Sequence, residues 1–197
     1  MEAHLGRGDI LFCLRMRTPG IISHPFTLDD LVKITGEQEL LQILDARGIE
    51  YARSEHPPVY TCDEAAQYRP PMPGVDTKNL FLRDEKHRFY LVMTACEKRL
   101  DLKALGRAIG APKLRFASEE ELLAVLGLTP GAVTVLALVN DAAGQVELLV
   151  DAAYWPEAYY LCHPLVNTAT LALSRESLER FLALTGHTPR VVEMPGR

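Results

Sequence analysis

Residues 77–94 read TKNLFLRDEKHRFYLVMT, two apolar stretches separated by a short polar connection. Residues 79–83 and 88–94 are rich in leucine, phenylalanine, tyrosine and valine, which is a composition typical of β-strands. Residues 84–87 are polar and predict the turn between them. The stretch is therefore interpreted as a β-hairpin, around which the rest of the chain is placed.

Upstream of the hairpin, two patterns predict helix starts. Thr35 with Gln38 fits a capping box before an apolar helical pattern, and Thr61 with Glu64 fits a second one. An extended piece is expected between these helices, at residues 50–56. Residues 69–74 contain three prolines and a glycine, so they predict a loop that leads into the hairpin.

Downstream, helices and strands are mixed. Strands are expected at residues 133–139 and 145–150, with a second hairpin turn between them at 141–144. Further strands are expected at 159–162, 168–173 and 191–192. Helices are expected at residues 100–109, 118–127 and from 174 onward. Ser118 with Glu121 fits a third capping box, at the start of the second of these helices. This order is not a regular strand–helix alternation, so it predicts an α+β fold with a mixed or mostly antiparallel sheet.

The length of 197 residues, with 48% hydrophobic and 24% charged residues, suits one domain of ordinary size. Residues 1–33 are expected to form an N-terminal extension outside the main fold, and residues 34–197 the domain itself. The apolar run at 10–13 is too short for a signal peptide or a membrane span, and Arg15 and Arg17 follow at once. No membrane association is expected.

The sequence lacks the common signatures of metal and nucleotide sites. The four cysteines (Cys13, Cys62, Cys96 and Cys162) form no CxxC pair, and they are expected to be reduced thiols in a cytoplasmic protein. No two of the six histidines have metal-ligand spacing, and no phosphate loop, dinucleotide fingerprint or nucleophile elbow is present. Neither a metal nor a cofactor is expected, so an enzyme here would act by positioning and electrostatics.

Three positions could carry chemistry. Lys78 stands at a strand entrance, where its ammonium suits a phosphate or a developing oxyanion, although a solvated lysine would look the same. His163 stands in a strand-end loop and could contact a substrate amine or hydroxyl, or simply fix the turn. Gly131 could let backbone N–H groups approach a ligand, or serve as a plain turn residue.

The charge distribution is uneven. The chain carries −5 overall, yet residues 98–115 hold six cations against one acid and so carry +5. Such a stretch could hold a phosphate backbone, although a solvated helix face is the simpler reading. The candidate RNA contacts are Lys98, Arg99, Lys103, Arg107, Lys113 and Arg115.

Four segments together resemble a known family: residues 77–84, 114–118, 130–134 and 163–170. In this order they are similar to the freestanding prolyl-tRNA editing proteins of the YbaK/ProX superfamily, which are related to the insertion domain of bacterial prolyl-tRNA synthetase. The resemblance covers about residues 35–193. It implies an α+β fold around a mixed, barrel-like sheet flanked by helices.

The resemblance also implies an activity: hydrolysis of the ester that joins a wrong amino acid to the terminal adenosine of a tRNA. The 78–82 and 163–167 signatures resemble the branch that removes alanine from tRNA(Pro), with prolyl-tRNA synthetase as a further possible partner. Deacylation of Cys-tRNA(Pro) or another mischarged tRNA, a non-catalytic tRNA- or synthetase-binding module, and a small-molecule-binding domain remain the alternatives.

Residue by residue, the resemblance implies that Lys78 is the essential lysine and that Asn79 contacts the substrate beside it. Tyr60 and Thr61 line the amino-acid pocket, and His163 sets its size limit. Gly131 and Thr134 belong to the substrate-facing loop, in which Val135 replaces the proline that usually ends it.

Overall fold

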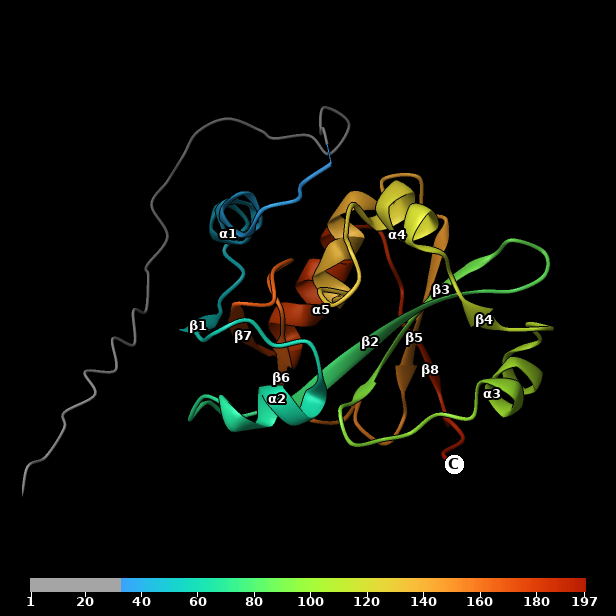
Figure 1. Cartoon of the computed structure of the whole chain (residues 1–197). Helices are drawn as coiled ribbons and strands as arrows, with labels where there is room; N and C mark the ends of the chain where they lie inside the picture. Colours follow the sequence, from blue (N-terminus) through green and yellow to red (C-terminus); the bar gives the residue numbers. More distant parts are fainter. Residues whose placement is uncertain (1–32) are drawn as a thin grey trace, which may run out of the picture.

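The computed structural model describes residues 33–197, so the expected N-terminal extension lies almost entirely outside the described residues. Helices and strands alternate irregularly along the chain (Figure 1). The helices are α1 (Glu37–Ala46), α2 (Cys62–Gln67), α3 (Leu102–Ile109), α4 (Glu119–Leu126), the 3-10 helix η2 (Val135–Asn140) and α5 (Arg175–Leu184). The strands are β1 (Ala52–Glu55), β2 (Val75–Arg83), β3 (Phe89–Ala95), β4 (Arg115–Phe116), β5 (Val146–Asp151), β6 (Tyr159–Cys162), β7 (Ala169–Ser174) and β8 (Arg190–Val192).

The strands form one mixed sheet in the order β1-β7-β6-β2-β3-β5-β8, with β4 on β2. The β2–β3 hairpin is confirmed: it pairs antiparallel from Thr77–Ala95 to Arg83–Phe89. The pairs β2–β6, β3–β5 and β5–β8 are parallel. The α+β class with a mixed sheet flanked by helices is therefore confirmed.

Strand β2 is longer than the sequence predicts, and this extension positions the site. Its first residues, Val75 and Asp76, pair with β6, whereas the rest of the strand pairs with β3. The sheet divides where β2 leaves β6, directly before Lys78. Lys78 therefore lies inside a strand, at the point where the two halves of the sheet separate.

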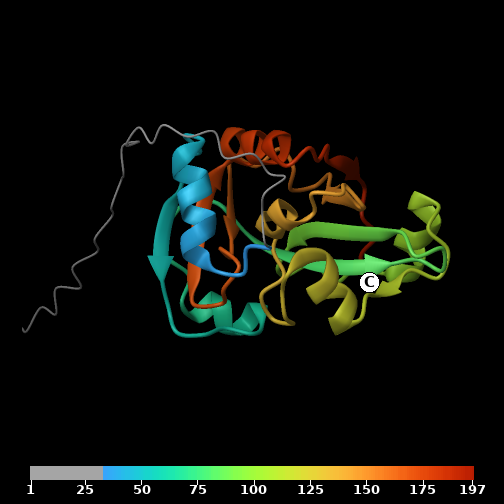
Figure 2. The ribbon, with the colours of Figure 1, turned by 90° about the horizontal axis from the view of Figure 1, so that it is seen from above.

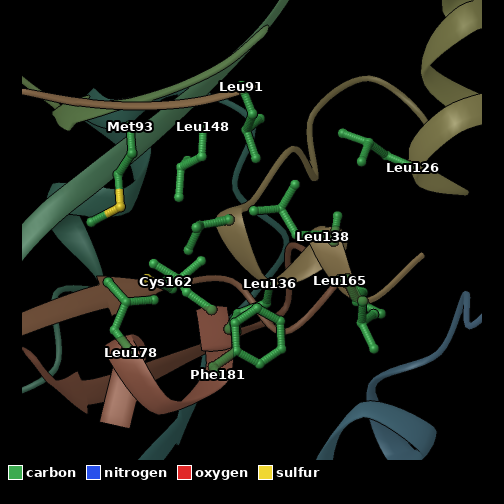
Figure 3. Close-up of a cluster of buried hydrophobic side chains, with 14 of the residues drawn as sticks. Leu91, Met93, Leu126, Leu136, Leu138, Leu148, Cys162, Leu165, Leu178 and Phe181 are labelled. Atoms are coloured by element: carbon green, nitrogen blue, oxygen red, sulfur yellow. The ribbon is translucent and has the colours of Figure 1, made fainter. Parts of the chain in front are cut away.

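The expected strand at 133–139 is wrong, because this segment forms the 3-10 helix η2. Thr134 begins the helix: its hydroxyl accepts a hydrogen bond from the N–H of Leu136. Every residue from Val135 to Val139 is buried, and Leu136 and Leu138 lie among side chains from β3, β5 and α5 (Figure 3). An apolar run buried on all sides has no period of 2 or 3.6, so its sequence alone does not distinguish a strand from a helix.

Helix caps agree with the sequence at two positions and differ at one. Ser118 and Glu121 form the expected capping box of α4, and Thr61 caps α2 by accepting the N–H of Glu64. The expected capping box at Thr35 is wrong, because Gly36 occupies the cap of α1 and makes no side-chain bond. Among residues 33–197, no helix is both long and apolar enough to span a bilayer.

Candidate active site

A cavity of about 190 Å³ opens where the two halves of the sheet divide. Its walls come from α2 and the loop before it, from the start of β2, from the end of β6 and from the loop before η2. Six residues that the sequence singled out line it together: Tyr60, Thr61, Lys78, Asn79, Gly131 and His163. These residues come from four separate segments of the chain, and only the fold brings them together.

Lys78 is held by the backbone on the opposite side of the hairpin. Its Nζ donates a hydrogen bond to the carbonyl oxygen of Cys96 at 2.8 Å. Burial lowers the pKa of Lys78 from its ordinary value, nearby Glu97 opposes this shift, and Arg99 reinforces it. One carbonyl uses one of the three ammonium donors, so two donors are left for a substrate oxygen.

Asn79 also lines the cavity, and its side chain has an unpaired atom. Its Oδ1 is the one buried side-chain oxygen or nitrogen atom in residues 33–197 that has no hydrogen-bond partner. A buried polar atom without a partner costs about 1–3 kcal/mol. A ligand N–H or O–H group that reached this atom would remove that cost.

His163 presents a second acceptor, because its tautomer is fixed. Nδ1 lies 3.0 Å from the carbonyl oxygen of Ala169, and a carbonyl can only accept, so Nδ1 carries the proton. Burial lowers the pKa of His163, the Ala169 carbonyl opposes this, and His56 lowers it further. The ring is therefore neutral at neutral pH, and Nε2 keeps a lone pair.

His56 also lines the cavity and is not among the residues expected from the sequence. Its ring lies edge-on to that of His163, with 6.0 Å between the centroids. Its Nδ1 lies 2.8 Å from the Pro57 carbonyl, and its Nε2 lies 3.0 Å from the hydroxyl of Thr170. The sequence signal for it is the His-Pro dipeptide, which occurs at 24–25, at 56–57 and at 163–164.

Tyr60 and Gly131 meet at the mouth of the cavity. Gly131 has φ +96°, and a Cβ atom added there would lie 3.3 Å from the Tyr60 ring. Tyr60 is 70% exposed, and Tyr68 at the other end of α2 is 45% exposed. Two aromatic rings thus stand at the rim, one of them against a backbone that only glycine keeps open.

Thr134 does not line the cavity. Its side chain is fully buried and caps η2, whereas its neighbour Val133 faces the cavity. Thr134 therefore acts on the loop of Gly131 indirectly, by fixing where the helix begins. Val135, which stands in place of the family's proline, is the first residue of that helix, a position that proline also tolerates.

The expectation of four reduced thiols is wrong. Cys62 at the start of α2 and Cys96 after β3 form a disulfide across the edge of the cavity, with 5.6 Å between their Cα atoms. Cys162 is free and buried. Cys13 lies outside the described residues. The pair was missed because the two cysteines are 34 residues apart and only the β2–β3 hairpin brings them together.

The candidate RNA contacts divide into two groups. Lys98 and Arg99 follow Cys96 beside the cavity, but the Lys98 ammonium pairs with the buried Asp151 at 2.7 Å. Both views place α3 at the far end of the molecule from α2 (Figures 1 and 2). Of the candidate contacts, Lys103, Arg107, Lys113 and Arg115 are exposed at that end, and Lys113 pairs with Glu85.

Known proteins share both the sequence and the fold. The family model for the aminoacyl-tRNA editing domain matches residues 56–181. The prolyl-tRNA editing protein ProX of Acetoanaerobium sticklandii is 38% identical over 159 residues, which cover 80% of this chain and 97% of that protein. Prolyl-tRNA synthetase associated domain-containing protein 1 of Danio rerio is 39% identical over 157 residues, 79% of this chain and 85% of that protein.

A crystal structure of a candidate trans-editing enzyme for prolyl-tRNA synthetase has the same fold. It superposes with a TM-score of 0.63 at 26% identity, and the match covers 83% of this chain and 99% of that one. These matches confirm the resemblance seen in the sequence, and with it the expected enzyme class, an aminoacyl-tRNA deacylase. The chain therefore belongs to the aminoacyl-tRNA editing domain family, as an editing protein of the YbaK/ProX type.

Proposed function

We propose that this protein hydrolyses Ala-tRNA(Pro) in trans, at the ester between alanine and the terminal adenosine. The observation that carries the proposal is the meeting of Lys78, Asn79 and His163 around one small cavity. A cation and two neutral acceptors suit an aminoacyl ester, which has an oxygen-rich end and a protonated amine.

In this proposal the two free donors of Lys78 contact the terminal phosphate or the ester oxygen, where negative charge gathers. Asn79 Oδ1 and His163 Nε2 accept from the α-ammonium of the amino acid. Both acceptors are uncharged, so they orient the amine without an ion pair that would hold the product.

No side chain is needed as a nucleophile, because an aminoacyl ester is already activated. A water molecule attacks the carbonyl carbon, assisted by the free hydroxyl of the terminal ribose, and backbone N–H groups near Gly131 stabilise the oxyanion. The role of Lys78 is to hold and neutralise this end of the tRNA.

The walls of the cavity supply selectivity. Alanine is smaller than proline, and a synthetase pocket for proline rejects it by only about 1–3 kcal/mol per missing methylene. A second pocket too small for proline completes the discrimination. Tyr60 and His163 form this size limit in the proposal, and Thr61 fixes the helix that carries the wall.

The exposed rings of Tyr60 and Tyr68 suit the unpaired 3′ end of a tRNA, because unstacked bases pack on aromatic side chains. The cations of α3 and β4 would contact phosphates further along the acceptor stem. Because tRNA editing belongs to translation, we place the protein in the cytoplasm, with tRNA(Pro) as partner and prolyl-tRNA synthetase as a second one.

A substrate panel tests this proposal. Ala-, Cys-, Ser- and Pro-charged tRNA(Pro) are incubated separately with the enzyme, and the loss of the aminoacyl group is followed over time. The proposal predicts rapid loss of alanine and retention of proline. Preference for the cysteine-charged tRNA would identify the protein as a Cys-tRNA(Pro) deacylase. Tight tRNA binding without any deacylation would indicate a non-catalytic tRNA-binding module.

A further inference from the structure

The disulfide between Cys62 and Cys96 spans the wall of the candidate active site. Cys62 is the first residue of α2, and Cys96 follows the last residue of β3. Both are half-buried and both line the cavity. A small reductant that enters the cavity therefore reaches the sulfur atoms directly.

On one side, the disulfide holds α2. This helix has six residues, and none of them is buried. A helix that short is not stable by itself and usually depends on packing of an apolar face, which α2 lacks. The covalent link therefore restrains the start of α2, while the ion pair between Arg69 and Asp76 at 2.6 Å restrains the chain after it.

On the other side, the disulfide is attached to Cys96, the residue whose backbone anchors Lys78. The carbonyl oxygen of Cys96 accepts the Lys78 ammonium at 2.8 Å, and the N–H of Cys96 donates to the carbonyl of Asp76 at 2.8 Å. The residues on both sides of Cys96 are fixed independently, since Thr94 and Lys98 both bind the buried carboxylate of Asp151. Reduction should therefore release α2 while most of the Lys78 anchor remains.

We propose that Cys62 and Cys96 are a reversible thiol–disulfide site whose oxidised form is the competent editing pocket. The co-reactant is a dithiol reductant. One of its thiolates attacks a sulfur of the pair and forms a mixed disulfide, and its second thiolate resolves it. The reductant loses two electrons and becomes a disulfide, while Cys62 and Cys96 gain two electrons and two protons.

Cys162 provides a contrast within the same chain. It also lines the cavity, but it is 2% exposed, and burial raises the pKa of its thiol to about 12. Because only the thiolate is reactive, Cys162 is inert at neutral pH. In a reducing compartment, a disulfide is usually transient and serves catalysis or redox sensing.

The covalent part of the proposal is tested by alkylation in the folded full-length protein, with Cys13→Ser as background. After mild oxidation, maleimide should label none of the three remaining cysteines. After dithiothreitol it should label Cys62 and Cys96 but not Cys162, and hydrogen exchange in residues 60–70 should become faster. Labelling of Cys62 and Cys96 without reductant, or unchanged exchange in α2, would overturn the proposal.

The functional part rests on the proposed editing activity. Reduction should slow deacylation of Ala-tRNA(Pro) by roughly tenfold to a hundredfold, the usual cost of a misplaced active-site element. The double variant Cys62→Ser/Cys96→Ser should match the reduced enzyme under both conditions. Equal rates for the oxidised and reduced enzyme would overturn the redox proposal. If neither form deacylates any tRNA but labelling and exchange behave as stated, the proposed function fails and the thiol–disulfide site stands.

Discussion

In the proposed function, the partial burial of Lys78 prepares its charge for a substrate. Its ammonium lies at the division of the sheet, bonded to one carbonyl, and desolvation lowers its pKa from the ordinary value of 10.5. A partly desolvated cation gains more from a substrate oxyanion than a fully hydrated one does. The sequence alone identified the residue by family resemblance, but not this environment, because burial is set by neighbours distant in the chain.

The lowered pKa of Lys78 predicts the direction of the pH dependence. The charged form is complete at low pH and is lost as pH rises through the lowered pKa, so enzymatic deacylation should decline at a lower pH than an ordinary lysine would give. The measurement is kcat/KM from neutral to alkaline pH, corrected for spontaneous hydrolysis. Lys78→Arg should move the decline to higher pH, because guanidinium stays charged. An unmoved decline would exclude Lys78 as its cause.

His163 is predicted to limit the size of the amino acid. His163→Ala removes the ring that lines the cavity, so Pro-tRNA(Pro) should be deacylated by the variant and not by the wild type. The measurement is the ratio of alanine to proline release. His87→Asn is a matched control: His87 lies exposed in the hairpin turn at φ 61°, a conformation that asparagine tolerates. Unchanged selectivity in His163→Ala would contradict this role.

At the scale of elements, the loop before η2 packs against the ring of Tyr60 at the mouth of the cavity. Gly131→Ala should lower the free energy of unfolding by about 1–2 kcal/mol, because alanine is strained at positive φ. It should also slow deacylation, since the new Cβ would press on the Tyr60 ring at 3.3 Å.

Gly144→Ala separates these two effects. Gly144 also has positive φ, at +61°, but nothing lies within 4 Å of an added Cβ. Denaturant unfolding should show a similar loss of stability in both variants, while only Gly131→Ala slows deacylation. Equal deacylation rates in the two variants would show that contact with Tyr60 has no part in catalysis.

Elements with local signals were predictable, and those set by tertiary packing were not. The hairpin, the caps of α2 and α4 and the mixed order of elements follow from turn residues, capping boxes and composition. The 3-10 helix at 135–140 and the extension of β2 through Thr77 and Lys78 depend on what packs around them. The disulfide depends on the register of two strands, which spacing in the sequence does not reveal.

At the scale of the whole molecule, helix α2, which lines the cavity, lies at one end and the basic helix α3 at the other (Figure 1). A tRNA whose 3′ end enters the cavity would extend its acceptor stem along the hairpin toward α3. The net charge of −5 makes this local basic region the natural place for phosphate contacts.

This arrangement predicts a salt-dependent contribution from α3. Replacing Lys103 and Arg107 by alanine should weaken tRNA(Pro) binding and lower the slope of log affinity against log salt by roughly 1–2. Binding is measured at several salt concentrations. Deacylation of alanyl-adenosine, which lacks the stem, should not change. An equal loss with alanyl-adenosine would place the effect at the pocket instead.

The central claim is that Lys78 carries the editing reaction, and single-turnover deacylation of Ala-tRNA(Pro) by Lys78→Ala tests it most directly. Lys33→Ala is the control, since Lys33 is exposed before α1, does not line the cavity and lies off the hairpin. Lys78→Ala should lose about a hundredfold or more in rate with its fold intact, the usual cost of removing a group that stabilises transition-state charge, while Lys33→Ala keeps the wild-type rate. A Lys78→Ala enzyme that deacylates as fast as the wild type would contradict the account.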